Sequence, residues 1–276
     1  MPSQPTILAV FAHPDDETGV MGTLALYTSQ GGRAYVACAT RGEEGQISDP
    51  SLATPESLGR VREQELREAC RIMGLEEPIF LGYRDSGMAG TPANHRPDSL
   101  AQADPKEVVG KVVRLIRELR PQVVITFDRT GVYGHPDHLA IHRYATEAFF
   151  QAGRGEAYPE QRLSPHAPQR LYYMAVPRSA VLRMAERMAA QGRSFSEDMP
   201  SPDNFGTPDE EITTYVDVSP FASLKQRALL AHRTQMGPDS PLAAMTEEDR
   251  AEWLGVESFR REYPPLSPGL RERALL

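Results

Sequence analysis

A short apolar segment that ends abruptly in a cluster of metal-binding side-chain types constrains this chain more than any other feature. Residues 7–11 (Ile-Leu-Ala-Val-Phe) form an apolar run that is typical of a buried strand in a parallel sheet. Four groups able to bind a metal follow it: His13, Asp15, Asp16 and Glu17. Ligands bind at the carboxyl ends of strands in open α/β sheets, so the pattern indicates a metal site. The alternative is a polar loop in which Asp16 or Thr18 caps a helix.

A second strand-to-loop junction of the same character lies far downstream. A β-branched segment at 122–128 (Gln-Val-Val-Ile-Thr-Phe-Asp) leads to residues 133–138 (Tyr-Gly-His-Pro-Asp-His). Two imidazoles, one carboxylate and an open fourth position are typical of catalytic zinc, with ligands at roughly 2.0–2.2 Å, and also suit Fe2+. If both strands lie in one parallel sheet, the loops meet and bring together His13, Asp16 and either His135 or His138.

At these two motifs the sequence resembles the LmbE/PIG-L family of zinc-dependent N-deacetylases. The resemblance rests on residues 12–17 (Ala-His-Pro-Asp-Asp-Glu) paired with residues 135–138 (His-Pro-Asp-His). It covers most of the chain and continues through segments 41–45, 84–90, 117–121 and, more weakly, 231–235. The segment 84–90 (Arg-Asp-Ser-Gly-Met-Ala-Gly) is most similar to the mycothiol branch, which contains the GlcNAc-inositol deacetylase and the mycothiol S-conjugate amidase. These motifs specify the family far better than the substrate.

The resemblance implies a role for each side chain of the two motifs. Zinc is expected on His13, Asp16 and His138, with the nucleophilic water in the fourth position. Asp15 is expected to be the general base for that water. His135 is expected to donate to the oxyanion or to the leaving amine, and Tyr133 is expected to add a hydroxyl donor beside it. Asp137 is expected to orient an imidazole.

The same resemblance implies three substrate contacts, which are Arg62, Asp85 and Met88. Glu43 is expected to be a fourth, because its loop follows a strand at the same edge of the sheet as the metal site. Each of them has a plainer interpretation. The loop that contains Glu43 is also typical of a solvated turn, and segment 84–90 is also typical of a connector. Arg62 is alternatively paired along its own helix with Glu65 or Glu68, which contributes only about 0.2–0.5 kcal/mol.

Short apolar strands alternate with amphipathic helices through about residue 150. This order predicts an α/β fold in which a Rossmann-like, mostly parallel sheet with right-handed crossovers is flanked by helices. The catalytic core is expected over residues 1–153. Residues 154–276 are expected to form a C-terminal α+β extension that walls the substrate site within one compact unit, with a helix over 221–234.

The charge balance excludes one large class of partners. The net charge is −8, which argues against nucleic acid, because binding to its backbone requires a basic surface.

Cys38 and Cys70 are the only cysteines, and buried thiols are expected rather than a disulfide. The N-terminal apolar run is too short for a signal sequence or a membrane span, so a cytoplasmic protein without membrane contact is expected. Relatives commonly self-associate, so a homo-oligomer is an alternative to a monomer, and the sequence does not decide between the two.

The expected function is zinc-dependent hydrolysis that removes the N-acetyl group from an N-acetylglucosaminyl conjugate, such as a precursor of a low-molecular-weight thiol. The alternative is an amidase that cleaves thiol S-conjugates in detoxification. A non-catalytic sugar- or nucleotide-binding protein is disfavoured because G-x-G-x-x-G and G-x-x-x-x-G-K-[ST] are absent, and a metallopeptidase because H-E-x-x-H and H-x-x-E-H are absent. The C-terminal third has no readable specificity motif, and only His232 and Gln235 are weak candidates for substrate contacts there.

Overall fold

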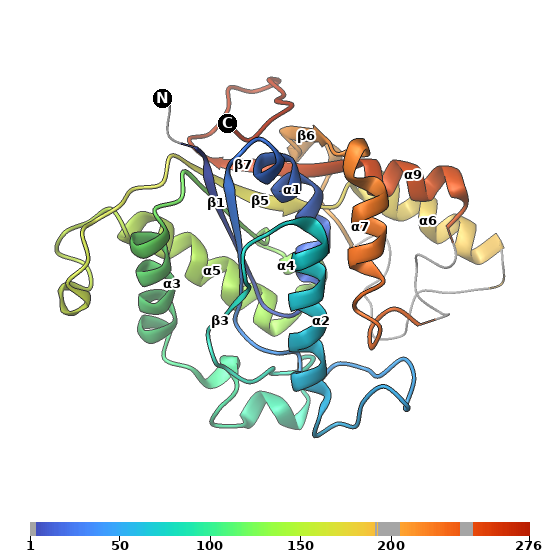
Figure 1. Cartoon of the computed structure of the whole chain (residues 1–276), viewed down its shortest axis with the longest axis horizontal. Helices are drawn as coiled ribbons and strands as arrows, with labels where there is room; N and C mark the ends of the chain where they lie inside the picture. The colour runs from blue at the N-terminus through green and yellow to red at the C-terminus, as the bar shows by residue number, and fades with distance from the viewer. Residues whose placement is uncertain (1–3, 191, 193–204, 238–244) are drawn as a thin grey trace.

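The protein is organised around a seven-stranded sheet (Figure 1). The computed structural model describes residues 4–190, 192, 205–237 and 245–276. Within these residues the strand order is β3-β2-β1-β4-β5-β7-β6. The strands are β1 Thr6–Phe11, β2 Arg33–Cys38, β3 Ile79–Phe80, β4 Val123–Thr126, β5 Arg170–Ala175, β6 Thr214–Asp217 and β7 Val256–Tyr263.

Strands β1 to β5 run parallel, and their order places a topological switch beside β1. Ile7 on β1 lies opposite Ala34 of β2 on one side and Val123 of β4 on the other. The chain therefore leaves β1 toward one edge of the sheet and returns to build the other edge after β3. Residues 7–11 are fully buried, as expected for a strand that is covered on both faces. A crevice for ligands is expected outside the carboxyl ends of strands at such a switch.

Helices cover both faces of the parallel part of the sheet. Helix α3 packs against α5, whereas α1, α2 and α7 contact one another, and Figure 1 shows the two groups on opposite sides of the strands. Within the described residues, no helix is both long and apolar enough to cross a membrane. The helices are α1 Met21–Ser29, α2 Leu58–Met73, α3 Pro105–Leu119, α4 Gly131–Gly134, α5 Pro136–Gln151, α6 Arg178–Ala190, α7 Ala222–Leu229 and α9 Glu247–Gly255.

Helix α3 illustrates how the local sequence sets these elements. Asp104 accepts a hydrogen bond from Lys106 N at the N-cap, and Pro105 occupies the first helical position. Arg120 ends the helix in the left-handed conformation, with φ at 51°. Full burial of each valine or isoleucine on its inner face contributes about 1.5–3 kcal/mol. These buried side chains recur at helical spacing, and they are Val108, Val109, Val112, Val113 and Ile116.

The C-terminal region extends the same sheet with antiparallel strands. Strand β7 pairs antiparallel with β5, and β6 pairs antiparallel with β7. Glu257 on β7 accepts hydrogen bonds from Gly22 N (2.9 Å) and Thr23 N (2.7 Å) in the first turn of α1, and it pairs with Lys225 (2.6 Å). These contacts tie the extension to the N-terminal half. The predicted α/β class with a mostly parallel sheet is confirmed, and the division after residue 153 stays a prediction.

One helix ends earlier than the sequence predicts. The pattern over 221–234 predicts a single helix, but α7 ends at Leu229. Beyond that point Thr234 donates to Glu65 from both its backbone N (2.9 Å) and its Oγ1 (2.6 Å). These tertiary hydrogen bonds outweigh the local helical preference, and the turn that they fix carries His232 into the interior, where it is fully buried.

Candidate active site

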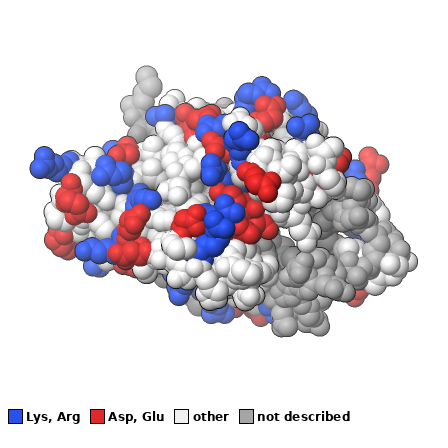
Figure 2. Space-filling view, turned by 90° about the horizontal axis from the view of Figure 1, so that it is seen from below, with Lys and Arg blue, Asp and Glu red and all other residues white. Residues whose placement is uncertain are grey.

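The two motif loops meet at the carboxyl ends of β1 and β4. These strands are adjacent and parallel, so the loop that follows Phe11 lies beside the loop that follows Thr126. Figure 2 shows the molecule from this side of the sheet, where acidic and basic side chains gather near the middle of the face. The structure thus brings together the two segments on which the metal-site prediction rests.

Three side chains form a compact triangle where the loops meet. His13 Nδ1 lies 3.2 Å from His138 Nε2 and 3.5 Å from Asp16 Oδ2, and Asp16 Oδ1 lies 3.2 Å from His138 Nε2. Ligand atoms placed at roughly 2.1 Å around a tetrahedral zinc ion are separated by about 3.4 Å. The three edges therefore fit a single small divalent cation. All three side chains are at most 10% exposed, so water competes little for the site.

An acceptor holds the far nitrogen of each imidazole in the triangle. His13 Nε2 lies 3.3 Å from Asp137 Oδ2 and 3.4 Å from Asp85 Oδ1. His138 Nδ1 lies 3.1 Å from the carbonyl oxygen of Gly131. When the far nitrogen carries the ring proton and donates it in a hydrogen bond to this acceptor, the facing nitrogen keeps a free lone pair, as a metal ligand requires. Both rings are therefore oriented toward the common centre.

Carboxylates around the triangle make it attractive to a cation. Burial alone lowers the pKa of His13, but Asp85, Asp137 and Asp16 outweigh burial and hold that pKa well above its ordinary value. Burial raises the pKa of Asp16, but the neighbouring His138 and His13 outweigh it and hold that pKa well below its ordinary value. The site therefore favours bound positive charge, and a proton on His13 competes with a metal ion for it.

The rings of His135 and Tyr133 lie against the triangle. His135 contacts both of its histidines, and Tyr133 contacts His138. The His135 ring centroid lies 4.6 Å from that of His13, and Tyr133 lies 4.9 Å from His138. His135 Nδ1 accepts the backbone N–H of Asp137 (3.2 Å), which leaves its proton on Nε2. Burial, followed by the effect of His13 and His138, lowers the pKa of His135 to about 4. A nitrogen atom of His135 also lies within 4.8 Å of those of His13 and His138, so both histidines of the second motif reach the centre.

Asp15 stands next to the triangle with its carboxylate turned to Arg62. The two side chains approach to 3.2 Å between Oδ2 and Nη2, and the Asp15 side chain remains 26% exposed. Its backbone is left-handed (φ 102°), which is uncommon for a residue with a side chain. Burial raises the pKa of Asp15 to about 6, against the lowering effect of Arg62. A carboxylate with this pKa that solvent can reach is suited to act as a general base near neutral pH.

The predicted substrate contacts on two loops border the centre. Asp85 is buried and faces His13, whereas Met88 further along the same loop is half-buried. Glu43 accepts the backbone N–H of Asp85 (3.1 Å) and pairs with Arg41 (3.2 Å). Glu43 therefore joins the 41–45 loop to the 84–90 loop instead of standing in a solvated turn.

Arg62 is buried, and its partners lie on the loops of the site. Nη1 donates to Gly42 O (2.9 Å) and Nη2 donates to Pro14 O (2.5 Å), in addition to the ion pair with Asp15. These partners occupy Nη1 and Nη2, whereas Nε has no hydrogen-bond partner among the described residues. A substrate contact for Arg62 stays a prediction. The alternative partners along α2 are engaged elsewhere, Glu65 with Thr234 and Glu68 with Arg71.

Two buried residues behind the site form a pair that sequence reasoning does not predict. Glu17 and His232 pair at 2.7 Å, and neither side chain is exposed. The burial of His232 excludes the weakly expected substrate contact, and Gln235 instead donates to Gln46 O (2.9 Å). Glu17 is visible in the first motif, but its partner lies 215 residues away in a segment whose pattern predicts a helix. Local patterns carry no signal that pairs two such residues.

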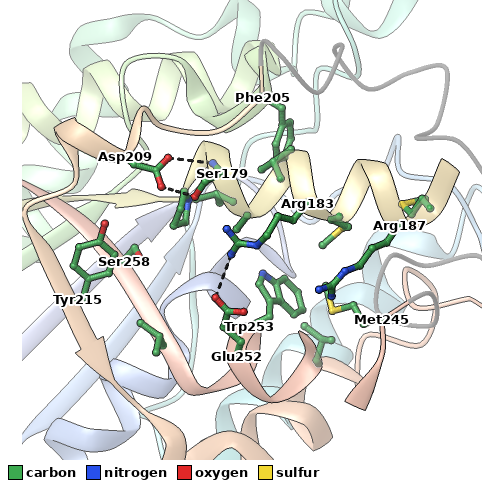
Figure 3. A pocket seen from close by; sticks show the side chains of 18 of the residues that line it. Ser179, Arg183, Arg187, Phe205, Asp209, Tyr215, Met245, Glu252, Trp253 and Ser258 are labelled. Atoms are coloured by element: carbon green, nitrogen blue, oxygen red, sulfur yellow. Dashed lines mark hydrogen bonds and ion pairs between the residues drawn. The ribbon is translucent and has the colours of Figure 1, made fainter. Parts of the chain in front are cut away.

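An apolar cavity lies away from the triangle. It has a volume of about 480 Å³ and is lined from α6, α9, β6 and β7 (Figure 3). Figure 3 shows Arg183 and Glu252 facing each other across it, in an ion pair of 3.1 Å. Phe205 lines the cavity and also stacks on Tyr133 at 6.3 Å, so the cavity adjoins the site through these two rings. Its volume is typical of a small-molecule site.

The sequence matches a known family and several named enzymes. Residues 8–149 match the PIG-L family, described as GlcNAc-PI de-N-acetylase, and this segment contains both motif loops. The chain is 40% identical over 270 residues to 1D-myo-inositol 2-acetamido-2-deoxy-alpha-D-glucopyranoside deacetylase from Acidothermus cellulolyticus, covering 92% of this chain and 87% of that protein. It is 39% identical over 268 residues to the enzyme of the same name from Thermobispora bispora, covering 92% and 86%.

Solved structures share the fold at lower sequence identity. N,N'-diacetylchitobiose deacetylase from Pyrococcus horikoshii matches with a TM-score of 0.64 at 20% identity, over 96% of this chain and 84% of that chain. GalB, the 4-carboxy-2-hydroxymuconate hydratase from Pseudomonas putida, matches with a TM-score of 0.59 at 17% identity, over 96% and 99%. A deacetylase and a hydratase thus share this fold, so the reaction has to be argued from the site.

Proposed function

The chain belongs to the PIG-L family of N-deacetylases, and from this premise we propose that it removes the acetyl group from an N-acetylglucosaminyl conjugate such as N-acetylglucosaminyl-inositol. The observation that carries the proposal is the buried triangle of His13, Asp16 and His138 with Asp15 beside it. Relatives at 35–40% identity over most of the chain carry the name of a deacetylase that acts on this substrate.

We assign the metal to the triangle, and we propose zinc. Two histidines and one carboxylate with an open position are typical of catalytic zinc, and the same set suits Fe2+. When bound, the cation polarises the amide carbonyl and makes water acidic enough to lose a proton near neutral pH. His13 and His138 hold their facing nitrogens toward it because acceptors occupy their far nitrogens.

Asp15 takes the proton of the attacking water on a carboxylate oxygen. With a pKa of about 6 the carboxylate is ionised at neutral pH, and it is basic enough to accept a proton in the transition state. Arg62 binds one of its oxygens and so fixes the direction of the carboxylate. The water oxygen bonds to the acetyl carbon, the amide C–N bond breaks, and the sugar amine leaves with the proton that Asp15 took from the water, while the acetyl group departs as acetate.

His135 and Tyr133 supply hydrogen-bond donors for this step. His135 carries its proton on Nε2, since Nδ1 accepts from the backbone of Asp137. Nε2 donates to the carbonyl oxygen as negative charge develops there, or to the leaving amine. Burial raises the pKa of Tyr133 well above its ordinary value, so its hydroxyl stays protonated and serves as a second donor. The Asp137 carboxylate orients His13 through Nε2.

The sugar and its aglycone are assigned to the loops that border the triangle. Glu43, Asp85 and Met88 are the proposed contacts, and Arg62 is a further one if its guanidinium exchanges partners. The region after residue 153 is proposed to wall this site. A cytoplasmic location and self-association stay predictions.

The proposal is tested by acetate release from a substrate panel with and without one equivalent of zinc. The panel holds N-acetylglucosamine, its malate and inositol conjugates, and a thiol S-conjugate that carries an apolar group. We expect zinc-dependent acetate release, fastest from a conjugate of N-acetylglucosamine. Absence of acetate release from every sugar by zinc-loaded protein would contradict the proposal.

A second candidate function is the amidase that cleaves thiol S-conjugates. The observation that favours it is the apolar cavity, which adjoins Tyr133 through Phe205 and offers space for an apolar substituent. Both reactions hydrolyse an amide with the same groups, so the panel separates them. Cleavage of the S-conjugate by an amidase releases a free amine without acetate, so free amine is measured beside acetate. Free amine from the S-conjugate with silence on the sugars would favour the amidase.

A further inference from the structure

A carboxylate and an imidazole without solvent exposure lie directly behind the proposed base. Glu17 Oε1 accepts from His232 Nε2 at 2.7 Å. The two residues come from opposite ends of the chain, Glu17 from the first motif and His232 from the turn after α7. A buried carboxylate is costly unless hydrogen bonds satisfy it, so the pair requires an explanation.

The second oxygen of this carboxylate holds the backbone of Asp15. Glu17 Oε2 accepts the backbone N–H of Asp15 at 2.8 Å. Asp15 has a φ of 102°, in the left-handed region that a residue with a side chain rarely adopts. Such a conformation persists where surrounding contacts impose it, and the hydrogen bond that Asp15 N–H donates to Glu17 acts on the strained residue itself.

The imidazole of His232 is oriented so that it donates a hydrogen bond to the carboxylate of Glu17. His232 Nδ1 has no hydrogen-bond partner among the described residues, so the bond to Glu17 is the polar contact of this ring. The turn that carries it is fixed by Thr234, which donates twice to Glu65 on α2. The C-terminal region therefore delivers a donor to Glu17 and orients it.

Arg62 acts on Asp15 from another direction. Its Nη2 contacts the carboxylate of Asp15 (3.2 Å) and donates to Pro14 O (2.5 Å). The side chain of the base is thus held by Arg62, while its backbone is held by Glu17. Loss of either contact allows the carboxylate to turn away from the water.

We propose that Glu17 and His232 form a positioning pair that holds Asp15 in its strained conformation and so aims the carboxylate at the attacking water. The inference rests on the proposed role of Asp15 as the base. Neither residue of the pair touches the substrate, so both act through Asp15 alone. Displacement of a catalytic group by about 1 Å can lower a rate by about 100-fold.

The test is a double-mutant cycle with Glu17→Leu and Asp15→Asn. Glu17→Leu removes both hydrogen bonds at similar side-chain size, and we expect kcat to fall about 10- to 100-fold with KM and bound zinc unchanged. In the Asp15→Asn variant, Glu17→Leu is expected to leave kcat unchanged, because the residue that Glu17 positions no longer acts as a base.

Conservative variants keep the test informative if Glu17→Leu fails to fold. Glu17→Gln retains an oxygen that accepts from Asp15 N, and His232→Gln retains a donor near the position of Nε2, so both are expected to keep most of kcat. His232→Leu is expected to lower kcat. Glu257→Gln is the matched control, since Glu257 is another buried carboxylate that accepts two backbone N–H bonds, and it is expected to lower thermal stability but not kcat.

The possible outcomes separate the inference from the proposed function. If Asp15→Asn lowers kcat, and Glu17→Leu lowers kcat by the same factor in the Asp15→Asn variant as in the unmutated protein, the two residues act independently. The positioning role is then overturned, and the role of Asp15 as the base stands. If Glu17→Leu or His232→Leu changes only stability, as Glu257→Gln does, the positioning role is also overturned. If Asp15→Asn keeps full turnover, the base and the positioning role fall together.

Discussion

The N-terminal half and the C-terminal third of this protein contribute to the site in different ways. The loops after β1 and β4 supply the three members of the metal triangle, together with Asp15 and His135. Within its described part, the region from β5 onward supplies no member of that triangle. It contributes His232 behind Asp15, and it lines the apolar cavity beside Tyr133.

The difference follows from how each kind of group is held. Groups that react lie shortly after the ends of buried strands, in the segment after β1 and in the loop and first turn of α5 after β4, where neighbouring strands fix their positions. Groups that support them are drawn from distant parts of the chain and are held by tertiary hydrogen bonds. Changes in the first region should therefore affect metal and chemistry, whereas changes in the second should affect geometry or substrate preference.

The largest effect is expected when a member of the triangle is removed. His138→Ala leaves His13 and Asp16 without their partner, so we expect loss of bound zinc and a fall in turnover of at least about 1,000-fold, because metal catalysis supplies several kcal/mol. Metal analysis of the purified variant, with acetate release, checks this. His166→Ala is the control, since His166 contacts Pro121 away from the site. Retention of zinc and turnover by His138→Ala would remove His138 from the ligand set.

A smaller but specific effect is expected at the base. Asp15→Asn keeps the size of the side chain but removes its basicity, so kcat should fall about 100- to 10,000-fold while zinc stays bound. Asp98→Asn, an exposed carboxylate paired with Arg96, should change neither quantity. If Asp15→Asn loses its zinc, Asp15 is a ligand and the division of roles between Asp15 and Asp16 is wrong.

The pH dependence of metal binding is expected to reveal the charge of the triangle. The carboxylates of Asp85, Asp137 and Asp16 hold the pKa of His13 well above its ordinary value of 6.5, so in the metal-free protein this imidazole keeps its proton to a higher pH than an ordinary histidine does. A metal ion must displace that proton, and its affinity should therefore rise about tenfold per pH unit until the raised pKa is passed. Zinc competition titrations between pH 6 and pH 8 measure this rise. An affinity that levels off at about pH 6.5 would show that the carboxylates do not hold His13 protonated.

The smallest effect is expected from the apolar cavity. Trp253→Ala removes a large ring from its wall, so KM for an S-conjugate with an apolar substituent should rise about tenfold, which corresponds to about 1.4 kcal/mol. KM for N-acetylglucosaminyl-inositol should change less than about twofold, because this polar conjugate has nothing to place in the cavity. Equal changes for both substrates would mean that the cavity does not distinguish them.

The fold and the metal triangle were accessible from the sequence for a physical reason. Strands such as residues 7–11 are buried on both faces, so they read as continuous apolar runs, and the polar groups that follow them mark the edge of the sheet. The charge-bearing motifs are local, so His13, Asp16 and the pair His135 and His138 stand out by type and spacing, and the family resemblance selects His138 from that pair. Their meeting needs only that β1 and β4 be adjacent and parallel, which the structure shows.

The supporting contacts could not be predicted in the same way. The pairing of Glu17 with His232 depends on α7 ending at Leu229, and Thr234 enforces that end through Glu65 on a different helix. Arg62 likewise leaves its own helix to bind backbone oxygens on two loops. Each of these contacts depends on tertiary packing, and the periodicity of the sequence does not predict it.

The central claim is that one metal ion, held by the triangle, makes this protein an N-deacetylase. The most direct test is titration of metal-free protein with zinc while acetate release from N-acetylglucosaminyl-inositol is followed. We expect no turnover without metal and a linear rise in turnover that breaks at one zinc per chain. Full turnover by protein shown to be free of metal, or a break that persists in His138→Ala, would contradict it.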